Sequence, residues 1–376
     1  MRLLATVTLR SNQFRSHFLP IVAIPEVEEV VLVADRPPPP DVPKIRAVIP
    51  SPTEKRLLGR AGSKLVRCAR IAAQMHPDWI LSYNIMPHGV NAHVAARLAG
   101  TRTMFHLIGG QDEWRGGGWR SDNAVLGRLP RPVRPVERAL LRVIRKATVV
   151  CTMGQAARDD LLDAGLRPEQ VVVVPPSVNL DRFMPAPADA PRAYDVVTVG
   201  DLIPRKRPWD FVRMIAELRR LRPQLRVAVV GDGPLRGEIE DLARALGVAD
   251  SVDFLGSRGD VASIYRSARV FALCSRHEGL SVAMIEAMAC GLPSVVTDVG
   301  DLSDLVHEGR NGHLLQVGDV QGLASRAEEL LSDEGRYARA SAAAHEDAAG
   351  YASVARVSEL YRRLFLGEPA DVERPS

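Results

Sequence analysis

Cysteine, aromatic residues and lysine are all scarce in this chain of 376 residues. The four cysteines, Cys68, Cys151, Cys274 and Cys290, show neither a C-x-x-C pair nor metal-ligand spacing. This argues against a disulfide framework and against a zinc site, and favours free thiols in a reducing compartment. Lysine occurs five times against 44 arginines, a skew that we attribute to genomic base composition.

No apolar run is long enough to cross a bilayer. The best, residues 19–33, is interrupted by Pro20, Pro25 and three glutamates. Arg10 and Arg15 arrive before an apolar stretch of the length that a secretory signal needs. We therefore expect a cytoplasmic protein.

Size and composition predict a soluble protein of two domains, with 46% hydrophobic and 25% charged residues. Residues 1–190 hold 26 Lys and Arg against 17 Asp and Glu, and the remainder 23 against 28. A basic amino-terminal half suits an anionic acceptor, or peripheral contact with the inner face of an anionic membrane. A solvated basic face explains the charge counts equally well. Nucleic acid is not an expected partner.

The carboxyl-terminal half alternates short Val-rich runs with helical patterns. Strands too hydrophobic to alternate, separated by helices, indicate a parallel sheet covered on both faces, with a ligand beyond the carboxyl ends of its strands. The predicted strands are 195–200, 225–231, 252–256, 270–274 and 294–297, and the predicted helices are 209–221, 235–246, 261–268 and 282–290.

The amino-terminal half repeats this pattern less clearly. Its predicted strands are 3–8, 29–33, 79–83, 103–108, 148–151 and 171–174. The proline-rich stretch 175–191 is typical of a linker. We therefore predict an amino-terminal domain over 1–185 and a carboxyl-terminal domain over 190–350. A last amphipathic helix, 351–367, follows a break at Gly350 and is a candidate to pack back on the first domain.

The stretch 278–286 follows a predicted strand and opens a helix. Gly279 permits a tight turn, and the backbone N–H groups of Leu280 and Ser281 would face outward at a helix start, which binds phosphate. Glu278 stands just before this end, where a carboxylate can accept hydrogen bonds from sugar hydroxyls. Glu286 is a lone carboxylate in an apolar helix, and ribose hydroxyls would satisfy it. The alternative is that Glu286 is an ordinary surface residue and that Glu278 precedes the helix by chance, without a role in binding.

Two further loops follow predicted strands. Arg205, Lys206 and Arg207 form a cationic loop that would neutralise a diphosphate, unless it is simply a solvated basic loop. The stretch 231–236 resembles a dinucleotide fingerprint but has arginine where the last glycine belongs. It therefore argues against a nicotinamide enzyme.

Taken in order, these pieces resemble glycosyltransferase family 4, whose members are retaining enzymes with two Rossmann-like doubly wound α/β domains that face each other across a cleft (the GT-B architecture). The resemblance spans about 190 to 320. It includes the glycine–lysine loop 200–206, the stretches 231–236 and 254–256, the Glu278–Glu286 pair with 287–293, and 297–300 with 311–312.

The resemblance implies a role for each matched residue. Lys206, in the loop that begins at Gly200, would contact the donor diphosphate, and Glu286 the ribose. Glu278 would lie against the transferred sugar. Backbone amides of Gly279, Leu280 and Ser281 would bind the phosphates, and Gly256 would lie near the base. The family usually has arginine where this chain has Asp201; Arg205 or Arg207 would then substitute, and donor affinity is the property affected.

The amino-terminal domain matches the family more loosely. His106 is the best match to the histidine that family members place near the reacting sugar, although a lone histidine is as often structural. The glycine-rich segment 109–118 is a candidate acceptor loop, in which Asp112 and Glu113 are the acidic candidates. Ser11 to Gln13 occupy the place of the glycine-rich turn of many members.

Arginines recur at helical spacing between Arg131 and Arg145, beside an apolar stripe. A basic amphipathic helix can rest on an anionic membrane. Packing of the apolar face on its own domain is the alternative, and we favour it.

We therefore predict a retaining glycosyltransferase that uses a nucleotide diphosphate sugar as co-substrate and needs no other cofactor. The chain has no Asp-x-Asp motif, so we expect metal-independent transfer in which cationic side chains stabilise the leaving diphosphate. A glycan, a lipid-linked molecule or a small molecule would supply the acceptor hydroxyl. The alternatives are an NAD-dependent oxidoreductase, which the failed fingerprint disfavours, and a non-catalytic nucleotide-sugar-binding partner of another transferase, which Asp201 keeps open.

Overall fold

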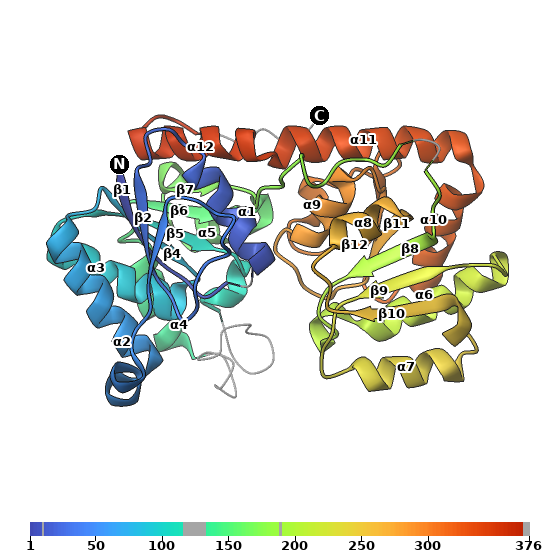
Figure 1. Cartoon of the computed structure of the whole chain (residues 1–376), viewed down its shortest axis with the longest axis horizontal. Helices are drawn as coiled ribbons and strands as arrows, with labels where there is room; N and C mark the ends of the chain where they lie inside the picture. Colours follow the sequence, from blue (N-terminus) through green and yellow to red (C-terminus); the bar gives the residue numbers. More distant parts are fainter. Residues whose placement is uncertain (10, 116–132, 188–189, 371–376) are drawn as a thin grey trace. The chain divides into compact units, whose positions relative to one another are not determined.

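The computed structural model describes residues 1–9, 11–115, 133–187 and 190–370 of the chain. The chain divides into two compact units. Unit 1 contains Met1–Ser177 together with the segment that begins at Val354, and unit 2 contains Val178–Ser353. Figure 1 shows one sheet flanked by helices in each unit.

The sheet of unit 1 has seven parallel strands in the order β3-β2-β1-β4-β5-β6-β7. The first six strands follow the Rossmann order, in which the direction of strand addition reverses between β1 and β4. The strands are β1 (Arg2–Thr6), β2 (Glu29–Val33), β3 (Ile45–Val48), β4 (Trp79–Tyr83), β5 (Arg102–Leu107), β6 (Val149–Thr152) and β7 (Val171–Val173).

Helices cover both faces of this sheet. On one face, Leu4 of β1 and Val31 of β2 lie in a core with Cys68 of α2 and Ala92 of α3. Elsewhere α12 packs against α1 (Figure 1), and Ser358 of α12 donates a hydrogen bond to the Pro20 carbonyl. The helices of this unit are α1 (Ser11–Val22), α2 (Pro52–Met75), α3 (Val90–Ala99), α4 (Arg134–Ile144), α5 (Gln155–Asp163) and α12 (Val354–Leu366).

Unit 2 has six parallel strands in the order β10-β9-β8-β11-β12-β13, again the Rossmann order, with its reversal between β8 and β11. Its strands are β8 (Tyr194–Val199), β9 (Val227–Val230), β10 (Val252–Gly256), β11 (Ala268–Leu273), β12 (Ser294–Thr297) and β13 (Gly312–Leu315). Its helices are α6 (Pro208–Leu221), α7 (Arg236–Ala245), α8 (Val261–Arg266), α9 (Val282–Ala289), α10 (Val320–Ser332) and α11 (Glu334–Ala352).

The predicted fold class, two doubly wound α/β domains, is confirmed. The sequence reading missed the edge strands β3 and β13, which have four residues each. Gly350 does not end a helix, because it lies inside α11; the break falls at Ser353. The segment predicted as a linker includes Val178, which pairs with Ser353 in an isolated bridge.

Among the described helices we find none that combines the length and the apolar character of a membrane-spanning segment.

Candidate functional site

Two loops of unit 2 meet where its strand order reverses. β8 and β11 pair directly in parallel, so the loops that leave their carboxyl ends lie at one edge of the sheet. The β8 loop carries Arg205 and Lys206 in a short 3₁₀ turn, and the β11 loop carries Ser275 and Glu278. A backbone hydrogen bond of 2.9 Å from the Arg276 N–H to the Arg205 carbonyl joins the loops. Open α/β sheets bind ligands at this position.

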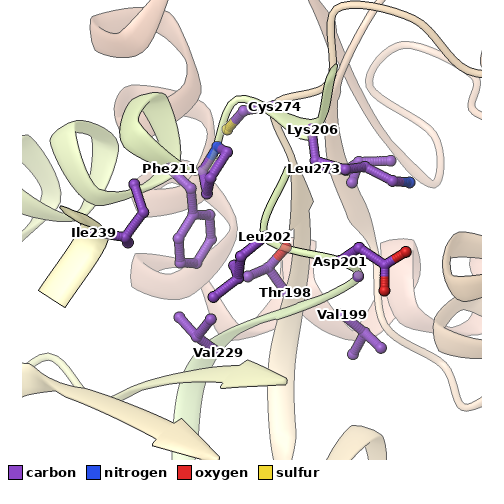
Figure 2. A pocket seen from close by; sticks show the side chains of 12 residues that line it. Thr198, Val199, Asp201, Leu202, Lys206, Phe211, Val229, Ile239, Leu273 and Cys274 are labelled. Carbon is purple, nitrogen blue, oxygen red and sulfur yellow. The ribbon is translucent and has the colours of Figure 1, made fainter. Parts of the chain in front are cut away.

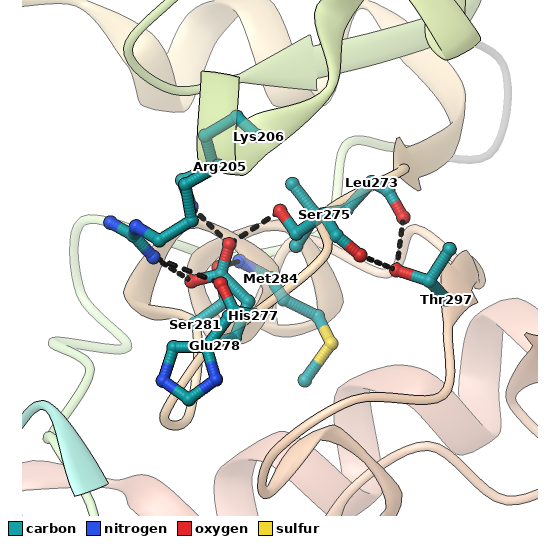
Figure 3. Close-up of polar contacts among 9 residues, drawn as sticks. All are labelled: Arg205, Lys206, Leu273, Ser275, His277, Glu278, Ser281, Met284 and Thr297. Carbon is teal, nitrogen blue, oxygen red and sulfur yellow. Dashed lines mark hydrogen bonds and ion pairs between the residues drawn. The ribbon is translucent and has the colours of Figure 1, made fainter. Parts of the chain in front are cut away.

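Glu278 is the centre of an ionic cluster between these loops (Figure 3). Its Oε1 atom lies 2.5 Å from Lys206 Nζ, and its Oε2 atom lies 3.3 Å from Arg205 Nη1. The Ser275 hydroxyl donates a third bond, of 2.5 Å, to Oε1. The Glu278 side chain is only 6% exposed. A carboxylate buried to this degree needs such partners, because isolated burial of its charge is costly.

The same contacts set the charge state of Glu278. Burial alone would raise the pKa of this carboxyl, but the charges of Lys206 and Arg205 and the hydrogen bonds of Lys206 and Ser275 lower it by more. The net pKa lies below the ordinary value, so Glu278 is ionised at neutral pH. The cluster therefore presents one carboxylate together with two cationic side chains.

Helix α9 begins at Val282, four residues after Glu278. The Ser281 side chain caps the helix by accepting a hydrogen bond of 3.4 Å from the Met284 N–H, as Figure 3 shows. Gly279 accepts a bond from the Asp301 N–H, and Leu280 is buried. Backbone N–H groups in the first turn of a helix lack intrahelical acceptors and carry the positive end of the helix dipole. The structure thus brings Glu278, Lys206 and the start of α9 together, and their role in binding phosphate stays a prediction.

Glycines allow the backbones around this cluster to approach closely. A Cβ atom on Gly300 would lie 1.9 Å from the Glu278 carbonyl oxygen, and one on Gly231 would lie 1.9 Å from the Gly200 carbonyl oxygen. A Cβ on Gly233 would come within 2.4 Å of the Leu202 carbonyl oxygen. The stretch that resembled a dinucleotide fingerprint therefore serves as packing for the β8 loop.

Gly200 and Asp201 line a narrow pocket at the carboxyl end of β8, together with Lys206 (Figure 2). The Lys206 chain passes over Gly200, at 3.7 Å from a Cβ placed there. Arg207, by contrast, pairs with the buried Asp210 of α6 at 2.6 Å. Of the two arginines that could compensate for Asp201, Arg205 is the one directed at Glu278.

Glu286 and Gly256 lie on other elements of unit 2. Glu286 is buried on α9 beside Tyr265 of α8; burial and then the nearby Glu286 charge raise the pKa of the Tyr265 hydroxyl. Gly256 ends β10 with a φ of 65°, and a Cβ there would lie 3.2 Å from Arg236 Nη1. The predicted donor residues thus occupy one unit.

His106, which the resemblance places near the reacting sugar, lies in the interior of unit 1, and its role at the sugar stays a prediction. The ring is 3% exposed and stacks on Tyr83 with centroids 4.2 Å apart. Its Nδ1 atom lies 3.2 Å from the Ser82 carbonyl and its Nε2 atom 2.9 Å from the Tyr361 hydroxyl. Burial, with the His17 charge, lowers its pKa to about 3. Both nitrogens are occupied, so His106 supports the attachment of α12.

Glu113 likewise has a structural role. It is buried, and its carboxylate accepts backbone hydrogen bonds of 2.7 Å from the Ile85 N–H and 2.8 Å from the Gly109 N–H. It thereby ties the loop after β4 to the loop after β5. Asp112 lies in the short turn Gly110–Glu113, but its side chain and residues 116–118 of the predicted acceptor loop are outside the described part of the chain.

The predicted basic helix corresponds to α4 (Arg134–Ile144). Arg131, the first arginine of the predicted series, lies outside the described residues. Leu140 and Ile144 of α4 are buried in the core of unit 1. The apolar face therefore packs on its own unit, which agrees with the favoured alternative and gives no support to a membrane role. Among the residues that the structure describes, no group of three His, Cys, Asp or Glu side chains is placed to hold a metal ion.

Sequence reasoning missed Ser275 and the dual pairing of Glu278. Ser275 follows β11 by two residues, and the carboxyl-end rule that singled out Lys206 would also have singled it out. Its carbonyl accepts a bond of 2.6 Å from the Thr297 hydroxyl (Figure 3). This bond fixes the β11 loop against the end of β12.

Family models and solved structures match this arrangement. Residues 27–182 match the model of Glycosyltransferase Family 4, and residues 182–347 match that of Glycosyl transferases group 1. Together the two models cover residues 27–347, which is most of the chain. The chain belongs to glycosyltransferase family 4.

Curated relatives match over part of their length. The chain is 37% identical over 216 residues to the D-inositol 3-phosphate glycosyltransferase of Thermobispora bispora, covering 52% of this chain and 50% of that protein. It is 32% identical over 225 residues to the GDP-mannose-dependent alpha-(1-6)-phosphatidylinositol monomannoside mannosyltransferase of Mycolicibacterium smegmatis, covering 54% and 58%. The chain spans about half the length of the curated relatives that it matches.

Solved structures match over almost the whole chain. Anabaena Alr3699/HepE in complex with UDP-glucose has a TM-score of 0.79 at 18% identity, covering 98% of this chain and all of that one. Sucrose-phosphate synthase from Thermosynechococcus elongatus has a TM-score of 0.76 at 18% identity, with the same coverage. At this identity, the likeness shows the shared fold.

Proposed function

We propose that this chain transfers a sugar from a nucleotide diphosphate sugar to a hydroxyl group of an acceptor, with retention of the anomeric configuration. The observation that carries the proposal is the ionised Glu278, held between Lys206 and Arg205 beside the start of α9. Family membership and the names of the relatives support the reaction class, and family membership alone supports retention.

Lys206 and Arg205 would bind the donor diphosphate. Their positive charges and the N–H groups at the start of α9 would face the phosphates, whose negative charge grows as the sugar–phosphate bond breaks. We propose that these groups take the place of a divalent ion. The cluster holds two positive side chains, Lys206 and Arg205, and one negative one, Glu278. A bound diphosphate would therefore meet a net charge of one positive unit.

Glu278 would orient the transferred sugar. An ionised carboxylate accepts hydrogen bonds from two hydroxyl groups at once, and its lowered pKa makes it a poor proton acceptor at neutral pH. Its role in the proposal is therefore to position the sugar and to stabilise positive charge at the reacting carbon. Glu286 would accept hydrogen bonds from the ribose.

The acceptor is proposed to be a hydroxyl-bearing glycan, glycolipid or small molecule. The names of two relatives specify D-inositol 3-phosphate and a phosphatidylinositol monomannoside. Both substrates offer ring hydroxyl groups, and this favours an acceptor with several hydroxyls.

A thermal-shift screen of nucleotide sugars tests donor binding. A ligand that binds only the folded chain stabilises it by about 2.7 kcal/mol at a hundredfold excess over Kd. We expect stabilisation by a uridine or guanosine diphosphate sugar, and a flat profile across both sets would contradict the proposal. Donor hydrolysis then tests catalysis: slow sugar release that Glu278→Ala abolishes supports a transferase, whereas binding without release supports the non-catalytic alternative.

A further inference from the structure

Ser275 contacts the Glu278 carboxylate from within the same loop. Its hydroxyl donates a hydrogen bond of 2.5 Å to Glu278 Oε1, the oxygen that also lies 2.5 Å from Lys206 Nζ (Figure 3). The other oxygen, Oε2, has one partner among the described residues, Arg205 Nη1, at the longer distance of 3.3 Å. Two close donors therefore fix one oxygen of the carboxylate, whereas the second oxygen is held loosely and keeps acceptor capacity.

The two donors to Oε1 differ in how far they can move. Lys206 carries its ammonium group on a flexible four-carbon chain and is 17% exposed. Ser275 is fully buried, and one side-chain torsion places its hydroxyl oxygen. Its carbonyl accepts a hydrogen bond of 2.6 Å from the hydroxyl of Thr297, the last residue of β12 (Figure 3). Ser275 is thus a fixed donor, anchored on the neighbouring strand, and Lys206 is a mobile one.

A donor diphosphate would act on these two partners of Glu278 differently. Its negative charge attracts Lys206, as the proposed function requires, and an ammonium group that turns toward phosphate has fewer N–H groups left for Glu278. The Ser275 hydroxyl is neutral and anchored. It therefore stays on Oε1 and keeps the carboxylate from rotating with the lysine.

Ser275 also supports the charge of Glu278. Burial acts to raise the pKa of this carboxyl, and the charges of Lys206 and Arg205, followed by the hydrogen bonds of Lys206 and Ser275, lower it by more. The loops after β8, β11 and β12 meet at Glu278, since a Cβ on Gly300 would touch its carbonyl oxygen. The other ionisable side chains of these loops are those of Asp201, Arg207, Arg276, His277, Asp298 and Asp301.

We propose that Ser275 is a positioning residue for Glu278: its hydroxyl holds Oε1 while the donor diphosphate engages Lys206, so that Oε2 is directed at the transferred sugar. The inference rests on the proposed transferase function. It gives the two carboxylate oxygens different tasks, Oε1 as the anchor and Oε2 as the acceptor for a sugar hydroxyl. Thr297 supports the arrangement by fixing the Ser275 backbone. Ser275 acts through Glu278 and not on the sugar itself.

The test measures donor hydrolysis, which needs no acceptor. UDP-glucose and GDP-mannose are each incubated with the full chain, and the donor that is hydrolysed faster is used for all variants. Ser275→Ala removes the hydroxyl that holds Oε1. Ser294→Ala is the matched control, because Ser294 on β12 is equally buried and its hydroxyl has no hydrogen-bond partner among the described residues.

We expect Ser275→Ala to lower kcat about tenfold or more while KM for the donor changes by less than about threefold, since the phosphate-binding groups are untouched. The acid side of the kcat profile should move to higher pH. Without the hydroxyl the pKa of Glu278 is less depressed, so the carboxylate is protonated earlier on acidification. Ser294→Ala should match the native chain in both respects, and Ser275→Thr, which keeps a hydroxyl, should recover most of the lost rate.

A second variant tests the anchor. Thr297→Val keeps the shape of the side chain and removes the hydroxyl that holds the Ser275 carbonyl. We expect the same pattern as for Ser275→Ala, with a smaller fall in kcat and native-like KM. Thermal unfolding is measured for every variant, and Thr297→Val takes the place of Ser275→Ala in the comparison if the latter does not fold.

Two outcomes would overturn the inference while leaving the transferase proposal in place. One is a kcat and an acid-side profile of Ser275→Ala that match those of Ser294→Ala. The other is a rise in KM without a fall in kcat, because this would place the hydroxyl in donor binding and not in the positioning of Glu278. A native chain that neither binds nor hydrolyses either donor would instead overturn the transferase proposal, and this inference with it.

Discussion

Lys206 Nζ lies 2.5 Å from Glu278 Oε1, although the two residues are separated by 72 positions in the chain. Their loops leave adjacent parallel strands, so the sheet topology brings them together. The pair leaves Glu278 charged and leaves Arg205 to contribute a second positive charge at the same carboxylate. A donor diphosphate that contacts Lys206 would therefore reduce the hold of this lysine on Glu278 and free the carboxylate to accept hydrogen bonds from the sugar.

Lys206→Ala is expected to lower donor hydrolysis by about a hundredfold or more, which is the usual effect of removing one group that stabilises developing negative charge. The lost cation also leaves Glu278 with weaker compensation for its burial. Hydrolysis of the donor found in the thermal-shift screen is the measurement. Arg220→Ala provides the control, because Arg220 is 73% exposed and forms an ion pair with Glu217, three residues earlier in the same helix. Equal rates for Lys206→Ala and the control would contradict the proposed role.

Gly300→Ala is expected to destabilise unit 2 more than Gly309→Ala does. Both glycines have a positive φ, 60° and 75°, so both alanines carry backbone strain of about 1 kcal/mol. Only at Gly300 would the new Cβ lie 1.9 Å from a backbone oxygen, that of Glu278; at Gly309 nothing lies within 4 Å. Chemical unfolding should show an additional loss for Gly300→Ala, together with weaker donor binding. Equal losses of unfolding free energy in the two variants would contradict this prediction, because they would mean that the Glu278 loop moves away from the new Cβ at little cost.

Stability should fall as the pH drops below about 6.5, because buried histidines stay neutral in the folded chain. The pKa of His106 is lowered to about 3 from the ordinary value of 6.5. Between these values the unfolded chain binds the extra proton, so stability rises with pH and is lost on acidification. One such histidine costs about 2 kcal/mol at pH 5. Urea unfolding from pH 7 to 5 should give a shallower pH dependence for His106→Gln; identical slopes would contradict the assignment.

Tyr361→Phe is expected to cost about 1–3 kcal/mol, because it leaves the buried Nε2 atom of His106 without its donor. Tyr337→Phe is the matched control. Tyr337 is also buried, but its hydroxyl has no hydrogen-bond partner among the described residues, so its loss should have little effect. The two variants are compared by thermal and chemical unfolding. A Tyr337→Phe loss as large as that of Tyr361→Phe would show that the Tyr361–His106 bond is not the stabilising contact.

Unit 2 was largely predictable from the sequence, because its signals are local. Val-rich strands followed by glycine and charged loops locate the strand ends, and in a parallel sheet those ends share an edge. Lys206 and Glu278 could therefore be placed in one site without coordinates. The contacts of Ser275 and Arg205 with Glu278 could not be predicted, because they depend on how the two loops fold over one another.

Unit 1 was less predictable because its polar residues depend on long-range contacts. His106 follows the same carboxyl-end rule as Lys206, yet Tyr361, 255 positions away, covers it. No local sequence pattern predicts a contact between residues so far apart in the chain. Asp35 and Lys64, which form an ion pair of 2.5 Å, were passed over for the same reason: a single aspartate after a strand and a lysine in a helix gain meaning only when the fold makes them neighbours.

The return of α12 to unit 1 affects the order in which the chain can fold during synthesis. Rings of α12 complete the interior of unit 1: Phe365 contacts Trp79, and Tyr361 contacts His106. Residues 178–353 of unit 2 precede α12 in the chain, so they leave the ribosome before α12 does. The half that is translated first must therefore wait, with an uncovered aromatic surface, until the second half has been made, and a chaperone would have its main opportunity to bind during that interval.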